Sequence, residues 1–138
     1  MKFMEPMSVK DMVADARTRI QGLSKEEMQR ELAAGDAVII DIRDVRERWR
    51  EGTIPGAKNV PRGMLEFWAD PQSEYYKPFM NSERRTILYC AGGQRSSLAA
   101  DVLQKMGYKN VAHLEMGYDA WKAEGGTWEE VPVPDKLR

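Results

Sequence analysis

Two short runs of almost continuous apolar residues constrain the fold of this chain more than any other feature. They are residues 37–41 (Ala-Val-Ile-Ile-Asp) and 86–89 (Thr-Ile-Leu-Tyr). A run without polar alternation is typical of a strand that is covered on both faces. Shorter strand patterns at 20–23, 58–60 and 110–114 alternate with helical patterns along the chain. The sequence therefore predicts an α/β fold, a single domain with a parallel β-sheet and helices on both faces.

Capping residues mark where several of the helices begin. Ser24 is followed by Glu27, and Asp44 by Glu47, which is the spacing of a capping box. A similar cap at Ser8 opens a helix near the amino terminus. Further helices are expected at 61–68, in the segment that follows residues 90–95 and ends at Met106, and at 118–124. We therefore divide the chain into an amino-terminal helical extension (1–22), a domain (23–126) and an extended carboxyl-terminal tail (127–138).

Composition narrows the classes of function. The formal net charge is −1, so the chain has no general attraction to nucleic acid or to a membrane surface. No apolar run approaches the roughly 20 residues of a membrane-spanning helix, and the first residues lack the apolar stretch of a secretion signal. The single cysteine cannot form an internal disulfide, which favours a reducing, cytoplasmic setting. One cysteine and one histidine argue against a zinc site, so no metal is expected.

That cysteine, Cys90, follows the apolar run 86–89 and opens the loop Cys90-Ala91-Gly92-Gly93-Gln94-Arg95, which leads into an amphipathic helix. Free N–H groups and the positive end of the helix dipole favour an anion at this position. Helix N-termini and nearby cations lower the pKa of a cysteine thiol from about 8.5 to roughly 3.5–7.5. We interpret Cys90 as a nucleophile in an anion-binding loop; the alternative is a small buried hydrophobic residue.

Four fragments in the right order resemble the rhodanese (sulfurtransferase) family, and together they span about residues 23–121. They are Asp41-Ile42-Arg43, the turn Gly52-Thr53-Ile54-Pro55-Gly56-Ala57-Lys58-Asn59, the loop Cys90 to Ser97, and Met116-Gly117 followed by Trp121. Two positions depart from the family pattern. Thr53 stands where a histidine is usual, which affects a local hydrogen bond. Tyr118 stands where a second glycine is usual, which we expect to alter one wall of the pocket and so the acceptor preference.

The resemblance implies a thiosulfate sulfurtransferase that carries sulfane sulfur as a persulfide on Cys90. The loop would bind the anionic sulfur or thiosulfate through the residues that follow the cysteine, namely Ala91, Gly92, Gly93, Gln94, Arg95 and Ser96. Arg95 would either touch the ligand or pair with a carboxylate that holds the loop. Asp41 and Arg43 would support the site. No cofactor is implied, and the partners would be small sulfur anions such as thiosulfate and a thiol, cyanide or persulfide-accepting protein.

Two other functions stay open. A non-catalytic rhodanese-like module would sense sulfur species or dock a partner protein. A phosphatase or arsenate reductase is disfavoured, because those relatives have five residues between cysteine and arginine and this chain has four, between Cys90 and Arg95. We interpret His113 as a structural or surface residue. We interpret the aromatic residues of 67–79 as a cover over one sheet edge or helix layer; the alternative is a binding surface at the mouth of the pocket. The sequence leaves open the physiological donor and acceptor, the oligomeric state, and whether the amino-terminal helix packs on its own domain.

Overall fold

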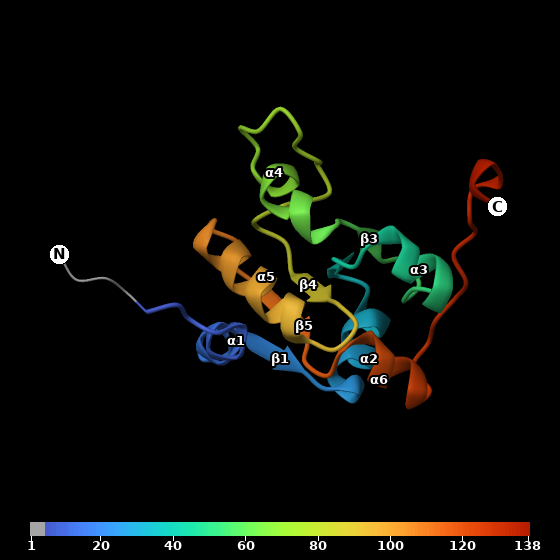
Figure 1. Cartoon of the computed structure of the whole chain (residues 1–138), viewed down its shortest axis with the longest axis horizontal. Coiled ribbons are helices and arrows are strands. Elements are labelled where there is room, and N and C mark those ends of the chain that lie inside the picture. Colours follow the sequence, from blue (N-terminus) through green and yellow to red (C-terminus); the bar gives the residue numbers. More distant parts are fainter. Residues whose placement is uncertain (1–4) are drawn as a thin grey trace.

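The sheet predicted from the apolar runs is present in the computed structural model, which describes residues 5–138. Its strands are β1 (Gln21–Leu23), β2 (Val38–Asp41), β3 (Lys58–Asn59), β4 (Thr86–Tyr89) and β5 (Val111–Leu114). All pair in parallel, in the order β1-β5-β4-β2-β3 (Figure 1). Because β4 is the central strand, the segment that follows it lies in the middle of the carboxyl edge, where parallel sheets bind ligands.

Helices cover both faces of the sheet, which confirms the predicted fold class. One face carries α1 (Val9–Arg17), α4 (Leu65–Ala69) and α5 (Gln94–Lys105), and the other carries α2 (Lys25–Ala34) and α6 (Gly117–Ala123), while α3 (Val45–Glu51) lies near β3 (Figure 1). The described part of the chain also contains the short 3-10 turns η1 (Arg62–Met64) and η2 (Asp135–Leu137). The helix around Met12, whose packing partner the sequence left open, packs on α5 of its own chain.

The absence of alternation in the two central strands follows from this two-sided burial. Neighbouring residues point to opposite faces, so Ile39 and Ile87 enter the core beneath α2 and α6, whereas Ile40 and Leu88 enter the core beneath α4 and α5. All four side chains are at most 7% exposed. Burying one such side chain stabilises the fold by roughly 1.5–3 kcal/mol, so both layers hold the sheet in register.

Local capping chemistry fixes several helix ends as predicted. The Ser24 hydroxyl accepts the N–H of Glu27 over 3.1 Å, and the Glu27 carboxylate accepts the N–H of Ser24 over 2.9 Å. Asp44 and Glu47 form the second capping box, at the start of α3. At the end of α2, Gly35 has the left-handed backbone that closes a helix (φ 75°).

Three elements differ from the sequence prediction. The helix expected over 61–68 is split into η1 and α4, because Pro61 stays outside as the N-cap and the chain first makes a 3-10 turn. The tail is not extended to its end, since Pro134 fixes a turn in which its carbonyl accepts the N–H of Leu137. The expected boundary at residue 22 falls inside β1, so the extension contributes an edge strand to the sheet. Residues 1–4 of that extension lie outside the described residues.

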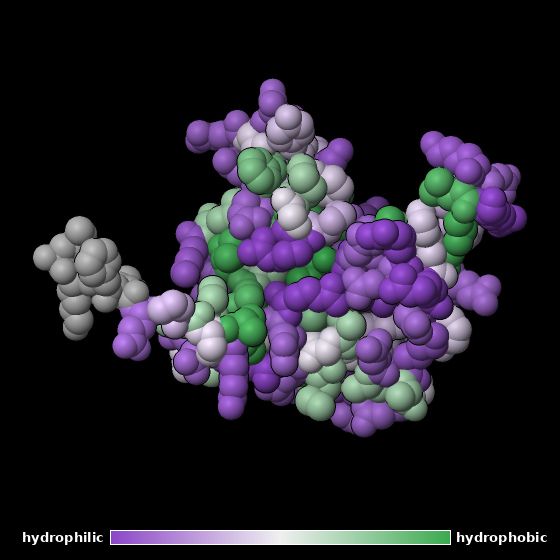
Figure 2. Space-filling model, viewed as in Figure 1, coloured by the Kyte–Doolittle hydropathy of each residue, from purple (hydrophilic) through white to green (hydrophobic). Residues whose placement is uncertain are grey.

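The segment before β4 covers the core only in part. Trp68, Tyr76 and Phe79 pack against the α4–α5 core, as the cover interpretation requires. Phe67 and Tyr75 are instead 52% exposed and contact each other edge to face. On the face in Figure 2, most residues are hydrophilic and the hydrophobic ones lie in several small areas. Among residues 5–138, no helix has both the length and the apolar character needed to cross a bilayer.

Candidate active site

Cys90 lies directly after the central strand β4, with its sulfur turned toward the start of α5. The backbone N–H groups of Gly93 and Ser96 donate to Cys90 Sγ over 3.2 and 3.3 Å. The Ser96 hydroxyl lies 3.6 Å from the same sulfur. Cys90 is only 1% exposed, but its surroundings are polar on this side and suit a negative charge. The rest of the Cys90 side chain belongs to the α4–α5 core, so the sulfur has apolar neighbours on one side and these N–H donors on the other.

The loop keeps this shape because two glycines allow close backbone approach. Gly93 has φ 90°, and a β-carbon on it would lie 2.0 Å from the carbonyl oxygen of Glu115. Gly117 has φ 83°, and a β-carbon there would lie 2.3 Å from the carbonyl oxygen of Ala91. Side chains are therefore excluded at both positions by backbone angle and by space. These contacts join the cysteine loop to the segment that precedes α6.

The first N–H groups of α6 hold the other side of the loop. The N–H of Tyr118 donates to the Cys90 carbonyl over 2.8 Å, and the N–H of Asp119 donates to the Ala91 carbonyl over 3.0 Å. Helix N-termini have such unsatisfied donors. The late Met116-Gly117 motif thus lies against the cysteine loop.

His113 lies closer to the cysteine than sequence reasoning expected. It is 1% exposed on β5, and its Nδ1 is 2.8 Å from the Ser96 hydroxyl, which in turn approaches Cys90 Sγ. Burial, and then the charge of Arg17, lowers the pKa of His113 to about 4, so the imidazole is neutral at neutral pH. One signal for this proximity was present in the sequence, because the expected strands 86–89 and 110–114 of a parallel sheet end at the same edge.

Arg95 pairs with a carboxylate, and this pairing was one of the two roles expected for it. Its guanidinium makes two hydrogen bonds of 2.9 Å to Glu47 on α3. The hydrogen bond from Arg95 lowers the pKa of Glu47 below its ordinary value. The Arg95 side chain is 44% exposed, so the pair connects α5 to α3 at the surface and its energy is modest.

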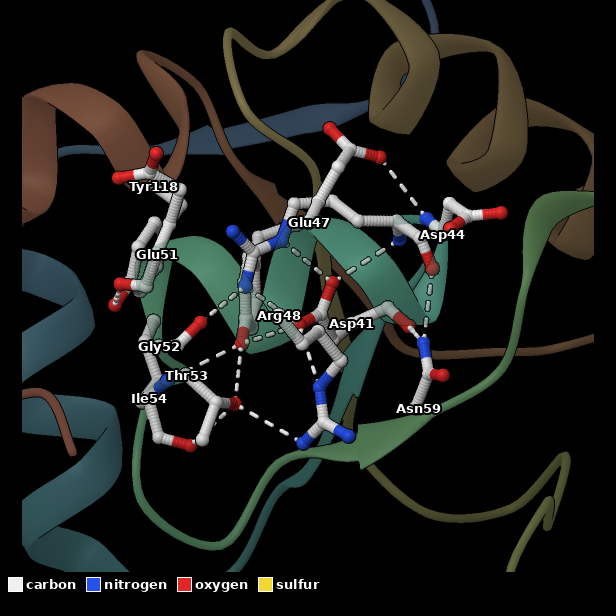
Figure 3. A network of polar contacts seen from close by, with 12 residues as sticks. Asp41, Asp44, Glu47, Arg48, Glu51, Gly52, Thr53, Ile54, Asn59 and Tyr118 are labelled. Carbon is white, nitrogen blue, oxygen red and sulfur yellow. Dashed lines mark hydrogen bonds and ion pairs between the residues drawn. The ribbon is translucent and has the colours of Figure 1, made fainter. Parts of the chain in front are cut away.

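Asp41 and Arg43 form a buried ion pair beneath α3. Arg43 donates to both carboxylate oxygens of Asp41, over 3.0 and 2.8 Å, and Arg48 donates to the same carboxylate over 3.1 Å. Arg43 also donates to the Gly52 carbonyl over 2.7 Å. Figure 3 shows Asp41 among the side chains of Arg48, Thr53 and Asn59. This network ties the end of β2 to α3 and to the turn after it.

The two departures from the family pattern both fall within this network. The Thr53 hydroxyl lies 2.9 Å from the Tyr89 hydroxyl, which donates to Asp41 over 3.0 Å. The expectation that Tyr118 alters a pocket wall is wrong, because Tyr118 is fully buried, with its ring 4.2 Å from the Arg43 guanidinium. Its hydroxyl donates to the Glu51 carbonyl over 2.8 Å. The larger side chain fills the core in place of lining a cavity.

Two cavities flank the cysteine loop. One, of about 610 Å³, lies between α1 and the loop and is lined by residues that include Arg17, Gly92, Gln94 and Glu115. The other, of about 250 Å³, is lined by Ala91 of the loop together with α3 residues and Arg43. Small-molecule sites commonly have volumes of about 300–1,000 Å³. Within the described residues, no three His, Cys, Asp or Glu side chains are grouped so that they could hold a metal ion.

The protein is an α/β protein with a parallel sheet, and a cysteine directly follows the central strand. Backbone N–H groups at the start of a helix donate to the sulfur of this cysteine. Comparison with known families gives the more particular assignment. The family model described as the Rhodanese-like domain matches residues 24–124, which is most of the chain. The chain therefore belongs to the rhodanese-like family, as the four sequence fragments indicated.

Three proteins that resemble this chain share between 28% and 45% of its residues in the matched regions. The human protein named thiosulfate:glutathione sulfurtransferase is 28% identical over 105 residues, covering 72% of this chain and 90% of its own length. A mitochondrial protein of Schizosaccharomyces pombe, provisionally named a thiosulfate sulfurtransferase, is 32% identical over 91 residues; the match covers 61% of this chain and 62% of that protein. A solved structure from Rhodopseudomonas palustris, described as a protein of unknown function and possible tyrosine phosphatase, is 45% identical with a TM-score of 0.85, covering 94% of this chain and 99% of its own.

Proposed function

We propose that this protein is a sulfurtransferase that moves sulfane sulfur through a persulfide on Cys90. The observation that carries the proposal is the pair of N–H groups, from Gly93 and Ser96, that donate to Cys90 Sγ. Such donors favour the thiolate over the thiol, and the thiolate is the nucleophile. The names of the human and S. pombe relatives point to the same chemistry.

The first half-reaction would load the sulfur. The Cys90 thiolate attacks the outer sulfur of thiosulfate, a sulfur–sulfur bond forms, and the bond between the two thiosulfate sulfurs breaks. The electron pair of that bond leaves with sulfite. Charge that reaches the outer sulfur in the persulfide anion would be stabilised by loop N–H groups in the way that an oxyanion hole stabilises an oxygen.

The second half-reaction would release the sulfur. A thiolate acceptor attacks the outer sulfur of the persulfide, and the Cys90 thiolate leaves with the bonding electron pair. Cyanide in the same role would give thiocyanate. Neither half-reaction needs a general base when both thiols react as thiolates. His113, with a pKa of about 4, could not take up the thiol proton to any extent at neutral pH.

Partners and setting follow from this chemistry. We expect thiosulfate or a persulfide as donor and a small thiol or a persulfide-accepting protein as acceptor. We keep the proposal of a cytoplasmic setting, in which a lone reactive thiol stays reduced. The name of the S. pombe relative places that protein in mitochondria, where the same chemistry would operate.

Mass spectrometry of the purified protein after treatment with thiosulfate tests the proposal. We expect one added sulfur atom on the parent chain, its loss on addition of cyanide, and no adduct on Cys90→Ala. A folded parent chain that gains no sulfur would favour the non-catalytic module. Hydrolysis of an aryl phosphate that depends on Cys90 would instead favour the phosphatase described for the R. palustris structure.

A further inference from the structure

Arg17, the last residue of α1, reaches the cysteine loop from outside the rhodanese-like segment. Its Nε donates to the Ser97 hydroxyl over 3.0 Å, and its Nη2 lies 3.4 Å from the Gly93 carbonyl oxygen. The Ser97 hydroxyl in turn donates to the same Gly93 carbonyl over 2.6 Å. A chain of hydrogen bonds therefore runs from Arg17 through Ser97 to the Gly93 carbonyl, which belongs to the residue whose N–H donates to Cys90 Sγ.

The Arg17 guanidinium forms no direct ion pair with a described residue. Among residues 5–138, no acidic side chain lies within 4.0 Å of its guanidinium nitrogens, whereas Arg95, the other arginine at the loop, is paired with Glu47. The charge of Arg17 also contributes, after burial, to the lowered pKa of His113, so its field extends to groups beside the sulfur. A nearby unpaired cation favours an anionic sulfur.

Arg17 lies outside the segment that the family model matches, so its contact with the cysteine loop is not part of the matched domain. The family model begins at residue 24, seven residues after Arg17. The match to the human sulfurtransferase covers 72% of this chain, but the match to the R. palustris structure covers 94%. The helix α1 is fixed on α5 by Val13 and Ala16, which are buried, and by Arg19, which donates to Asp101 over 2.9 and 2.8 Å.

We propose that Arg17 is a positioning residue for the sulfur site: it holds the Gly93 peptide through Ser97 and supplies unpaired positive charge that favours the thiolate and the persulfide. A hydrogen bond from a charged donor is stronger than one from a neutral donor. Because the Arg17 side chain is exposed, we expect the charge effect to be smaller than for a buried cation. The persulfide part rests on the proposed function, but the effect on thiol ionisation does not.

The test compares Arg17→Met, Arg17→Lys and Arg19→Met in the full chain. The measurements are the pH profile of Cys90 alkylation by iodoacetamide and the kcat of sulfur transfer from thiosulfate to cyanide. Arg19→Met is the matched control, because it removes an arginine that ties α1 to α5 without contacting the cysteine loop. Thermal unfolding of each variant reports how far α1 has loosened.

We expect Arg17→Met to move the midpoint of the alkylation profile upward by roughly half a unit to one unit and to lower kcat. The midpoint shift should shrink at about 1 M salt, where the screening length is about 3 Å. Arg17→Lys keeps the positive charge, so the midpoint of its alkylation profile should stay close to the parental value. Its kcat should fall below the parental value. Arg19→Met should change the melting temperature and leave both readouts at the parental values.

Parental midpoints and parental kcat in Arg17→Met would overturn the proposal. An equal shift in Arg19→Met would overturn it too, because loosening of α1 alone would then explain the effect. If the parent chain transfers no sulfur, the proposed function fails, and the alkylation midpoints still decide the role of Arg17.

Discussion

At the scale of single residues, Gly93 is the most constrained position of the candidate site. It is the N-cap residue of α5, its N–H donates to Cys90 Sγ, and its carbonyl accepts the Ser97 hydroxyl. Its φ of 90° lies in the left-handed region, and the Glu115 carbonyl occupies the space where a β-carbon would stand. The adjacent Gly92 has neither constraint, because nothing lies within 4 Å of a β-carbon built on it.

This contrast gives a matched pair of substitutions. Gly93→Ala should lower the free energy of unfolding by at least about 2 kcal/mol, from backbone strain and from the displaced Glu115 carbonyl. Gly92→Ala should stay within about 0.5 kcal/mol of the parent chain. Urea unfolding of both variants measures the difference. Equal stability of the two variants would mean that the backbone around Gly93 relaxes freely.

The residues of the candidate site differ in how far the sequence alone could predict them. Cys90 and the loop glycines could be predicted, because a strand, a glycine loop and a helix are consecutive in the chain. The contacts of Arg17 and His113 could not, since each crosses a long stretch of sequence to reach Ser97 or Ser96. Only the folded sheet brings such side chains to one edge.

At the scale of elements, Arg95 and Glu47 join α5 to α3 next to the cysteine loop. Sequence reasoning left two roles for Arg95, and the bidentate pair with Glu47 corresponds to the loop-holding one. Both side chains are partly exposed, so the pair should contribute at most about 1 kcal/mol to stability.

We predict that Arg95→Gln and Glu47→Gln lower the kcat/KM for thiosulfate by similar amounts, roughly threefold to tenfold, because each breaks the same connection between α5 and α3. Steady-state kinetics with thiosulfate and cyanide provide the measurement, and the double variant should add little to either single change. A loss that is much larger in Arg95→Gln would instead indicate direct contact between Arg95 and the donor.

Elements that depend on local chemistry were predicted best. Each of the capping boxes that begin at Ser24 and Asp44 specifies the start of a helix through only four consecutive residues, and both capping boxes are present in the structure. Pro61 and Pro134 were less informative, because a proline fixes its own φ but does not specify whether the next turn is extended, 3-10 or α-helical. Tyr118 was placed wrongly because its environment is formed by Arg43 and Tyr89, residues from two other parts of the chain.

At the scale of the whole molecule, the stability of the fold should depend on His113. This residue is the only histidine in the chain. Its pKa falls from 6.5 to about 4 on folding, chiefly because of burial. Between these values the unfolded chain binds a proton on the imidazole and the folded chain does not. Lowering the pH therefore favours the unfolded state.

We predict that the free energy of unfolding falls by about 2 kcal/mol between pH 7 and pH 5, and that His113→Asn largely removes this dependence. Carboxylates with lowered pKa values, such as Glu47 and Asp101, lose their contributions only at lower pH. Urea unfolding at several pH values checks both statements. If the free energy of unfolding of His113→Asn fell with pH as steeply as that of the parent chain, the effect would belong to other groups.

The hydrogen bonds from the start of α6 to the cysteine loop bear on how the protein matures. During synthesis, Cys90 and Ala91 leave the ribosome before Tyr118 and Asp119, whose N–H groups later bind the two carbonyls. A nascent chain that ends before these residues carries the thiol without the helix that fixes its loop. Reactivity toward sulfur compounds should therefore be acquired late, only after Tyr118 and Asp119 have been made and have bound the cysteine loop.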